Sequence, residues 1–323
     1  MSDWQDSRMP TLLVASGGGH FEELRLLRSR LGVQPEDSTW VTWDTAQTRS
    51  ALGVEERIFV ERCQPKDLRR VLSDSVVARR VLSSRHWDRV VSTGSIVAVP
   101  FLMMARYYGI ACHYIESAAR MTGPSLSARI LERVPGVRCY GQSRSWTAGR
   151  RSWQYRGSVF DAFDAAGRPP RDITKVVVSL GTSRYPFTRL VHSLRNVLPS
   201  SAEIVWQIGP TPLEVPGLRT YDQMAQEDLT AVMREADLVI AHAGVGTALQ
   251  AMEAGHCPLL IPRRADHREH VDDHQFEVAS ELAGRGLATV CEPEEITLDL
   301  LAAASVRGVT PSAHLPDFVL DEA

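Results

Sequence analysis

The sequence predicts an α/β protein of two doubly wound domains, each built around a parallel sheet. Its 323 residues are 44% hydrophobic and 23% charged, which is an ordinary globular composition, and this length favours two domains. Short apolar segments alternate with longer helical patterns, as is typical of β-α-β units. The alternation starts again in the second half of the chain, so each half is expected to form its own sheet.

The expected strands and domain boundaries follow from this alternation. In the first half, strands are expected at 11–15, 39–43, 57–60, 89–93, 111–116 and 137–141. In the second half, they are expected at 175–180, 203–208, 237–242, 258–262 and 287–290. The Gly-, Pro- and charge-rich stretch that follows the first half indicates a linker. The expected organisation is an N-terminal domain over 1–160, a linker over 161–174, a C-terminal domain over 175–305 and a tail over 306–323.

Charge is divided unevenly between the halves. Residues 1–170 contain 24 Arg and Lys against 17 Asp and Glu, a net +7, whereas residues 171–323 contain 12 against 22, a net −10. The basic half could face anionic lipid, with the Arg- and aromatic-rich segment 127–156 at the membrane surface; two differently solvated surfaces without a partner are the alternative. No nucleic-acid recognition motif is found.

The expected location is the cytoplasm. Five scattered cysteines without a C-x-x-C pair, in a chain without a secretion signal, indicate reduced thiols. No apolar run approaches the length of a membrane span. Contact with the inner face of the cytoplasmic membrane would therefore be peripheral.

Three glycine-containing turns follow expected strands. They are "SGGGH", "STGS" and "SLGT", and glycine there lets the backbone approach a ligand near the free N–H groups of the next helix. Each also fits an ordinary turn between a strand and a helix. The candidate residues are Gly18, Gly19 and His20, then Thr93, Gly94 and Ser95, then Gly181 and Thr182.

A fourth turn lies in "HAGVGTALQAMEAGHCPLLIP", residues 242–262. A strand is expected to end at His242, and the turn through Gly244 opens a helix. Backbone amides of Val245, Gly246 and Thr247 would point at a phosphate, helped by the helix dipole. The spacing therefore predicts an anion site.

The pattern "HAGVGT…EAG…P…P…DDHQ" resembles the nucleotide-sugar-binding domain of inverting GT-B glycosyltransferases, in the group that contains the peptidoglycan lipid-intermediate GlcNAc transferase MurG. Through "SGGGH", "STGS" and "YIESAAR", the first half resembles the acceptor-side subunit of the two-subunit dolichol-pathway GlcNAc transferase. The second half resembles that enzyme's catalytic subunit, so the chain resembles a fusion of the two. The segment "PRR…EHVDDHQ" is most similar to bacterial exopolysaccharide transferases, some of which use UDP-glucuronic acid.

The resemblance implies a GT-B fold, two Rossmann-like domains facing a crevice, and roles for several residues of the second half. Residues 244–247 would bind the diphosphate. Gln250 stands where the family places a ribose-binding Glu, and Glu253, one helical turn later, is the alternative. Residues 221–229 are expected near the uracil. His274 and Gln275 stand where the family reads the hydroxyls of the donor sugar.

The segment 263–275 also raises the question of a metal. His267, His270 and His274 could share a helix face and bind one, but the resemblance implies that amides and a helix dipole stabilise the leaving diphosphate. No metal and no cofactor are therefore expected, and the segment is expected to hold the donor sugar. Arg263 could pair with a uronic-acid carboxylate or be a solvated surface residue.

The implied reaction is inverting transfer from a UDP-sugar (UDP-glucuronate, UDP-GlcNAc or a UDP-hexose) to a hydroxyl of a polyprenyl-diphosphate-linked saccharide, in exopolysaccharide or cell-surface glycan synthesis. His20 is the expected general base and Glu116 in "YIES" is the alternative. Two other functions stay open: transfer to a small soluble natural product, and a non-catalytic UDP-sugar-binding partner subunit. The sequence leaves the sugar, the acceptor and a homo-oligomeric state undecided.

Overall fold

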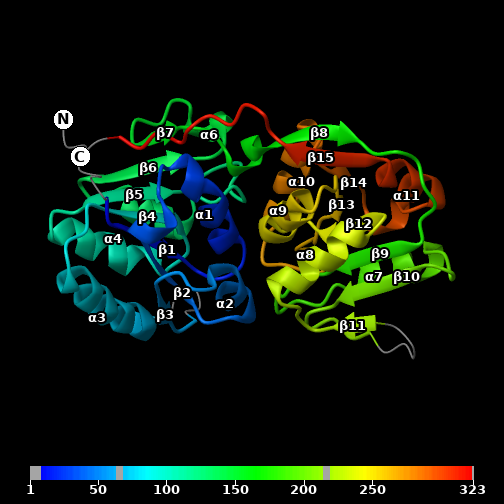
Figure 1. Ribbon diagram of the computed structural model, residues 1–323, viewed down its shortest axis with the longest axis horizontal. Coiled ribbons are helices and arrows are strands. Elements are labelled where there is room, and N and C mark those ends of the chain that lie inside the picture. The colour runs from blue at the N-terminus through cyan, green and yellow to red at the C-terminus, as the bar shows by residue number, and fades with distance from the viewer. Residues whose placement is uncertain (1–8, 63–67, 214–218, 322–323) are drawn as a thin grey trace, which may run out of the picture. The chain divides into compact units, whose positions relative to one another are not determined.

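The computed structural model describes residues 9–62, 68–213 and 219–321. The chain divides into two compact units, each with its own parallel sheet (Figure 1). Unit 1 comprises Met1–Val159 with Pro316–Ala323, and unit 2 comprises Phe160–Leu315. The predicted fold class, two doubly wound α/β domains, is confirmed.

Within the described residues, unit 1 contains a seven-stranded sheet in the order β3-β2-β1-β4-β5-β6-β7, with every neighbouring pair parallel. Its strands are β1 Thr11–Ala15, β2 Ser38–Trp43, β3 Arg57–Val60, β4 Arg89–Gly94, β5 Ala111–Ile115, β6 Val137–Gly141 and β7 Trp153–Tyr155. Its helices are α1 Gly19–Arg30, α2 Ala46–Leu52, α3 Leu68–Ser84, α4 Ala98–Tyr107, α5 Leu126–Leu131 and α6 Arg144–Thr147, with a short 3-10 helix at Pro35–Asp37.

Both faces of this sheet are covered. Because side chains alternate along a strand, Leu12 and Val14 of β1 join the core that α3, α4 and α5 form on one face. Phe21 of α1 packs against Trp40 at a ring-centroid distance of 5.1 Å and lies outside that cluster. The chain end returns to unit 1, where the buried ring of Phe318 packs edge-on against Tyr140.

Unit 2 contains, in the described part, a six-stranded parallel sheet in the order β11-β10-β9-β12-β13-β14 and a two-stranded antiparallel pair of β8 and β15. The strands are β8 Phe163–Gly167, β9 Lys175–Ser179, β10 Glu203–Gln207, β11 Arg219–Tyr221, β12 Leu238–His242, β13 Leu259–Ile261, β14 Thr289–Val290 and β15 Arg307–Pro311. The helices are α7 Thr188–Val197, α8 Gln226–Glu235, α9 Val245–Glu253, α10 His274–Gly284 and α11 Leu298–Ser305, with 3-10 helices at Val159–Ala162 and Pro293–Glu295.

The unit 2 sheet is also covered on both faces. Val176 and Val178 of β9 contribute to a core with residues of α7 and α11. Val177, between them, joins the opposite core with residues of α8 and α9. The central strands of both sheets, such as β1 and β9, are therefore buried on two sides, as parallel strands generally are.

The structure differs from the prediction at the unit boundary. The range 161–174 contains β8 and the range 306–323 contains β15, so neither is an irregular connection throughout. The two strands pair with each other from Arg307 opposite Gly167 to Pro311 opposite Phe163. A pairing between segments about 140 residues apart leaves no local trace in either sequence, which is why both ranges resemble a linker and a tail.

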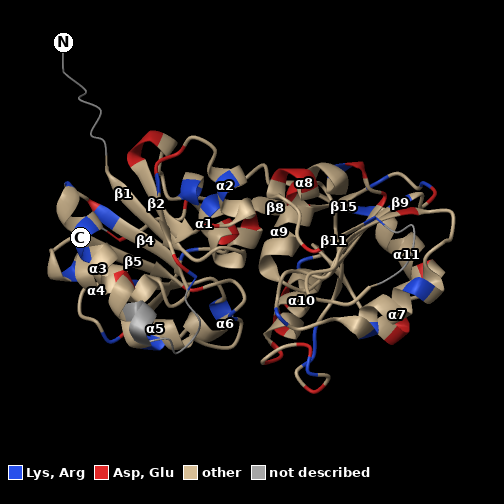
Figure 2. Cartoon of the chain, turned by 90° about the horizontal axis from the view of Figure 1, so that it is seen from below, with Lys and Arg blue, Asp and Glu red and all other residues tan. Residues whose placement is uncertain are grey.

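The described residues also bear on membrane and thiol chemistry. No helix in the described ranges combines the length and the apolar character that a membrane span needs. Four of the five cysteines are described, and all four are free and buried. Figure 2 shows acidic residues on α8, whose first turn carries Glu227 and Asp228.

Candidate active site

Three glycine turns meet at the carboxyl ends of the unit 2 strands. Gly181 follows β9 with φ of 75°, Gly209 follows β10 with φ of 57°, and Gly244 follows β12. A β-carbon on Gly209 would lie 2.3 Å from the carbonyl oxygen of Gly181. The turns approach each other so closely that only glycine fits.

The imidazole of His242 fills the space between two of these turns. A β-carbon on Gly181 or Gly244 would lie 2.4 or 2.3 Å from the His242 ring, whose Nδ1 faces the Ser179 carbonyl oxygen at 3.4 Å. Burial, and then the positive charge of Arg263, lower the pKa of His242 to about 3. His242 is therefore neutral at physiological pH and positions the turns.

The N-terminus of α9 begins directly after this turn. Gly244 is its N-cap residue, and among the described residues no side chain caps it. Gly246 and Thr247 in its first turn are half-buried, and Thr182 of the neighbouring turn is exposed. Backbone N–H groups at a helix start can bind an anion, so the predicted phosphate-binding residues lie together in unit 2.

Gln250 on α9 is buried and connects α9 to α8 by hydrogen bonds. Its amide nitrogen donates to the Gln226 carbonyl oxygen and to the Thr230 hydroxyl, both at 2.9 Å. Both N–H donors of the amide are thus used by α8, and a ribose hydroxyl could meet only its oxygen. Glu253, one turn further along α9, is half-buried.

The prediction for Arg263 needs correction. Its side chain is fully buried, and its guanidinium donates to the carbonyl oxygens of Leu180 (2.6 Å), Tyr185 (2.6 Å) and Glu269 (3.1 Å). Burial lowers the pKa of Arg263 to about 10, so it remains charged. Arg263 is therefore not a surface arginine. Its guanidinium is not free to bind a uronic-acid carboxylate, because it connects the turn after β9 to the segment 263–269 by hydrogen bonds.

The segment after β13 is a closed loop and not a helix. Arg268 has φ of 59°, the buried Glu269 carboxylate accepts from the Arg264 amide, and Arg189 pairs with Glu269 at 3.1 Å. His267 is exposed, so the three histidines of this segment share no helix face. Gln275 is buried at the start of α10, and its side-chain oxygen accepts from the Arg263 amide at 3.2 Å.

In unit 1, His20 is held by the turn after β4. Its Nδ1 lies 2.9 Å from the Thr93 carbonyl oxygen, and the Thr93 hydroxyl donates to the His20 carbonyl oxygen. Gly94, with φ of 115°, lies against the His20 ring and the Tyr114 hydroxyl. Ser95 has φ of 69°, rare for a residue with a side chain. The structure therefore brings the first two predicted turns together.

Glu116, the alternative base, is buried, whereas a general base must reach the substrate. Its carboxylate accepts from the Tyr114 hydroxyl (3.2 Å) and from the amides of Ser117 (3.0 Å) and Ser125 (2.7 Å). Burial raises its pKa. Glu116 thus organises the loop after β5, and among the two candidates His20 is the half-exposed one.

Glu23 and Gln142 are parts of this region that the sequence analysis missed. The fully buried Glu23 accepts from the Ser117 hydroxyl (2.6 Å), the Ala118 amide (2.8 Å) and the Gln142 amide nitrogen (2.7 Å). Gln142 in turn accepts from the Val159 amide at 2.7 Å. Glu23 stands one turn before Leu27 on the sheet-facing side of α1, and this acidic residue on an apolar helix face is the signal that could have revealed it.

The chain is similar in sequence to known glycosyltransferases. Residues 176–307 match the model of the glycosyltransferase family 28 C-terminal domain. The UDP-N-acetylglucosamine–N-acetylmuramyl-(pentapeptide) pyrophosphoryl-undecaprenol N-acetylglucosamine transferase of Acinetobacter baumannii is 25% identical over 93% of this chain and 89% of its own. A UDP-N-acetylglucosamine transferase subunit of Mus musculus is 34% identical over 30% of this chain and 8% of its own.

Solved structures share the fold at low identity. MurG of Acinetobacter baumannii has a TM-score of 0.53 at 19% identity, covering 91% of this chain and 88% of its own. The glycosyltransferase SnogD of Streptomyces nogalater has a TM-score of 0.57 at 18% identity, covering 92% of each chain. A putative UDP-N-acetylglucosamine 2-epimerase of Listeria monocytogenes has the same TM-score at 11% identity, covering 91% of this chain and 94% of its own.

Because an epimerase shares it, this fold alone does not define the reaction. The domain match over residues 176–307 and the relative that is 25% identical over 93% of this chain indicate a glycosyltransferase. The chain is a glycosyltransferase with the GT-B fold, and its residues 176–307 match the family 28 C-terminal domain.

Proposed function

We propose that this glycosyltransferase moves a sugar from a UDP-sugar to a hydroxyl of a polyprenyl-diphosphate-linked saccharide, with inversion at the anomeric carbon. The single observation that carries the donor part is the uncapped start of α9, where Gly244 and the amides of Val245, Gly246 and Thr247 follow the turn held by His242. The family 28 domain match covers this turn.

The leaving diphosphate is stabilised by these amides and by the helix dipole as negative charge develops on it. The neutral His242 keeps the two glycine turns apart without adding a titrating charge. In this proposal the diphosphate itself needs no metal ion. Glu253, with the Gln250 oxygen, would meet the ribose, Gln275 and His274 the donor sugar, and residues 221–229 the uracil.

His20 is the proposed general base. A carbonyl oxygen can only accept, so the imidazole must donate from Nδ1 to Thr93, and its neutral form then carries the lone pair on Nε2. That nitrogen can take the proton of the attacking acceptor hydroxyl. Gly18 and Gly19 precede His20 in the same turn.

A lipid-linked acceptor fits an exposed apolar surface of unit 1. α4 packs between α3 and α5, and these helices expose Leu72 (69%), Val76 (70%), Met103 (48%), Tyr107 (81%) and Leu126 (62%). Exposed apolar side chains on helices that pack together are typical of an interaction site. Together with the net positive charge of residues 1–170, it supports peripheral contact with an anionic membrane leaflet.

The testing experiment is calorimetric titration of UDP into the full chain, with and without EDTA, followed by transfer assays with a panel of UDP-sugars. UDP binding that survives EDTA, and transfer to a polyprenyl-diphosphate saccharide, are expected. Loss of UDP binding in EDTA would contradict a metal-free diphosphate site. Transfer only to a soluble aglycone would contradict the lipid-linked acceptor and favour a small natural product instead. UDP-sugar binding without turnover on any acceptor would indicate a non-catalytic partner subunit.

A further inference from the structure

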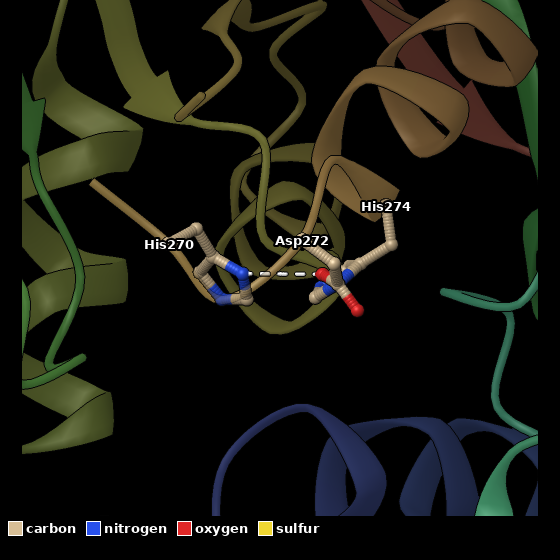
Figure 3. Close-up of side chains that lie close together, drawn as sticks. All are labelled: His270, Asp272 and His274. Atoms are coloured by element: carbon tan, nitrogen blue, oxygen red, sulfur yellow. Dashed lines mark hydrogen bonds and ion pairs between the residues drawn. The ribbon is translucent and has the colours of Figure 1, made fainter. Parts of the chain in front are cut away.

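His270, Asp272 and His274 converge in unit 2, just before and at the start of α10 (Figure 3). Each offers one ligand atom, and the three atoms lie within 4.8 Å of one another. The two imidazole rings are 4.6 Å apart between centroids and nearly perpendicular. Because the segment is a turn, alternate residues of the motif His-x-Asp-x-His come together without a shared helix face.

The separation of His270 and Asp272 suits a small divalent ion. The His270 Nδ1 lies 3.3 Å from the nearer Asp272 oxygen, and the His274 Nδ1 contacts the same oxygen. Two ligands of a tetrahedral zinc ion, each about 2.0–2.1 Å from the metal, are separated by about 3.3 Å. Two imidazoles and one carboxylate are also a donor set that Zn²⁺ accepts.

One atom of this cluster lacks a hydrogen bond. The His270 Nδ1 is buried and makes no hydrogen bond in the part of the chain that the structure describes; its nearest polar neighbour is the Asp272 oxygen at 3.3 Å, which forms an ion pair with a protonated imidazole. A buried polar atom without a partner costs about 1–3 kcal/mol. A coordinated ion would satisfy this nitrogen and would also use the Asp272 carboxylate between the two rings.

The surrounding loop is held in place, as a metal site requires. Glu269, next to His270, accepts from the Arg264 amide and pairs with Arg189. Asp273, next to His274, accepts from the Ala265 amide at 2.9 Å. The ligand side chains stay accessible, with exposed fractions of 14% for His270, 22% for His274 and 42% for Asp272.

We propose that His270, Asp272 and His274 bind a divalent transition-metal ion of the zinc class. Three protein ligands leave a further coordination position for water or another oxygen ligand. The site departs from the metal-free loop that the sequence predicts. His274 is then a metal ligand instead of a contact of the donor sugar, whereas the amides of α9 that are proposed to stabilise the diphosphate are not among the ligands, so UDP binding in EDTA tests them separately.

The experiment is calorimetric titration of ZnCl₂ into the full chain, after EDTA treatment and dialysis into metal-free buffer. Binding of one ion per chain is expected, weakened about tenfold or more in Asp272→Asn and abolished in the double variant His270→Ala, His274→Ala. His267→Ala is the matched control, because His267 lies in the same loop, is exposed and belongs to no such cluster. It should bind like the natural chain.

Thermal unfolding with and without Zn²⁺ separates loss of the site from loss of the fold. A ligand that binds the native state raises the unfolding temperature, so Zn²⁺ should stabilise the natural chain and His267→Ala equally, Asp272→Asn less at the same concentration, and the cooperatively unfolding double variant not at all. The proposal would be overturned if the double variant bound Zn²⁺ unchanged, or if the natural chain bound no Zn²⁺ with one-to-one stoichiometry. The cluster would then be only an ion pair of His and Asp. UDP binding in EDTA is measured on the same samples and reports on the donor site separately.

Discussion

The Nδ1 of His20 lies 2.9 Å from the carbonyl oxygen of Thr93, which fixes the imidazole tautomer and leaves Nε2 to accept a proton. His20→Ala should therefore lower kcat by about 10²–10⁴-fold, the usual contribution of a positioned general base. Its effect on UDP binding, which the proposed function assigns to unit 2, should be negligible. Steady-state kinetics and calorimetry measure the two effects.

His86→Ala is the control for His20→Ala, because the His86 side chain is 81% exposed in the same unit. It should leave kcat unchanged. An equally active His20→Ala variant would remove His20 as the base and direct attention to another group of unit 1.

The two glycines that contact His242 should respond differently to a β-carbon. Gly244 has an ordinary φ of −84°, and the nearest atoms to an added β-carbon all belong to the His242 ring, so Gly244→Ala should cost about 1–3 kcal/mol for overpacking. Gly181 has φ of 75°, so Gly181→Ala adds a left-handed strain of about 1–2 kcal/mol. Each variant should lower the unfolding temperature and weaken UDP binding.

Combination with His242→Ala separates these two causes in a double-mutant cycle. Removal of the ring should restore most of the stability lost in Gly244→Ala and only part of that lost in Gly181→Ala. Additive losses at Gly244 would show that the ring is not the obstacle.

Arg263 should behave as a positioning residue rather than a reader of the donor sugar. Arg263→Lys cannot reach the carbonyl oxygens of Leu180, Tyr185 and Glu269 together, so the free energy of unfolding should fall by about 3 kcal/mol, as for a broken buried charged network. The ratio of activities with UDP-glucuronate and UDP-glucose should not change. A selective loss with UDP-glucuronate would restore a carboxylate-reading role.

The surface variant Arg264→Ala provides the comparison for Arg263→Lys. Arg264 pairs with Glu292, and both side chains are partly exposed. Loss of such a pair costs about 1 kcal/mol or less. If Arg264→Ala lowered the free energy of unfolding as much as Arg263→Lys, the loss in Arg263→Lys could not be attributed to the burial of Arg263.

The sequence predicted the parallel strands well because each is a continuous apolar segment bounded by turn residues. The strands β1, β3 and β6 have the predicted bounds. It missed β7 and β11, three-residue strands at sheet edges whose pairing depends on neighbours distant in the sequence. Local pattern carries little information on such pairings.

The same distinction applies to the candidate site. Glycine spacing predicted the turns at Gly94, Gly181 and Gly244, because close backbone approach demands that residue. Arg263 could not be assigned from its neighbours, since the three carbonyl oxygens that it binds come from segments up to 83 residues away. Glu116 was likewise predicted as a base from the motif "YIES" alone. Its burial depends on tertiary packing, which the motif does not show.

Glu23 should make the stability of the chain depend on pH. Burial raises its pKa to about 7 from an ordinary value of 4.5, against the opposing hydrogen bonds from Ser117, Ala118 and Gln142. Between pH 4.5 and 7 the folded chain therefore binds a proton that the unfolded chain has released. Stability is thus lost as pH rises through this window, by on the order of 3 kcal/mol, and the loss is complete above pH 7.

Glu23→Gln removes the titrating group, so the difference in unfolding free energy between the natural chain and this variant should change with pH from 4.5 to 7 and level off above. Glu22→Gln is the control, because Glu22 is the adjacent buried carboxylate of α1 and pairs with Arg25. Chemical unfolding at a series of pH values measures all three chains. A difference that stays constant across this window would mean that Glu23 is already ionised in the fold, and that its three hydrogen bonds outweigh the cost of burial.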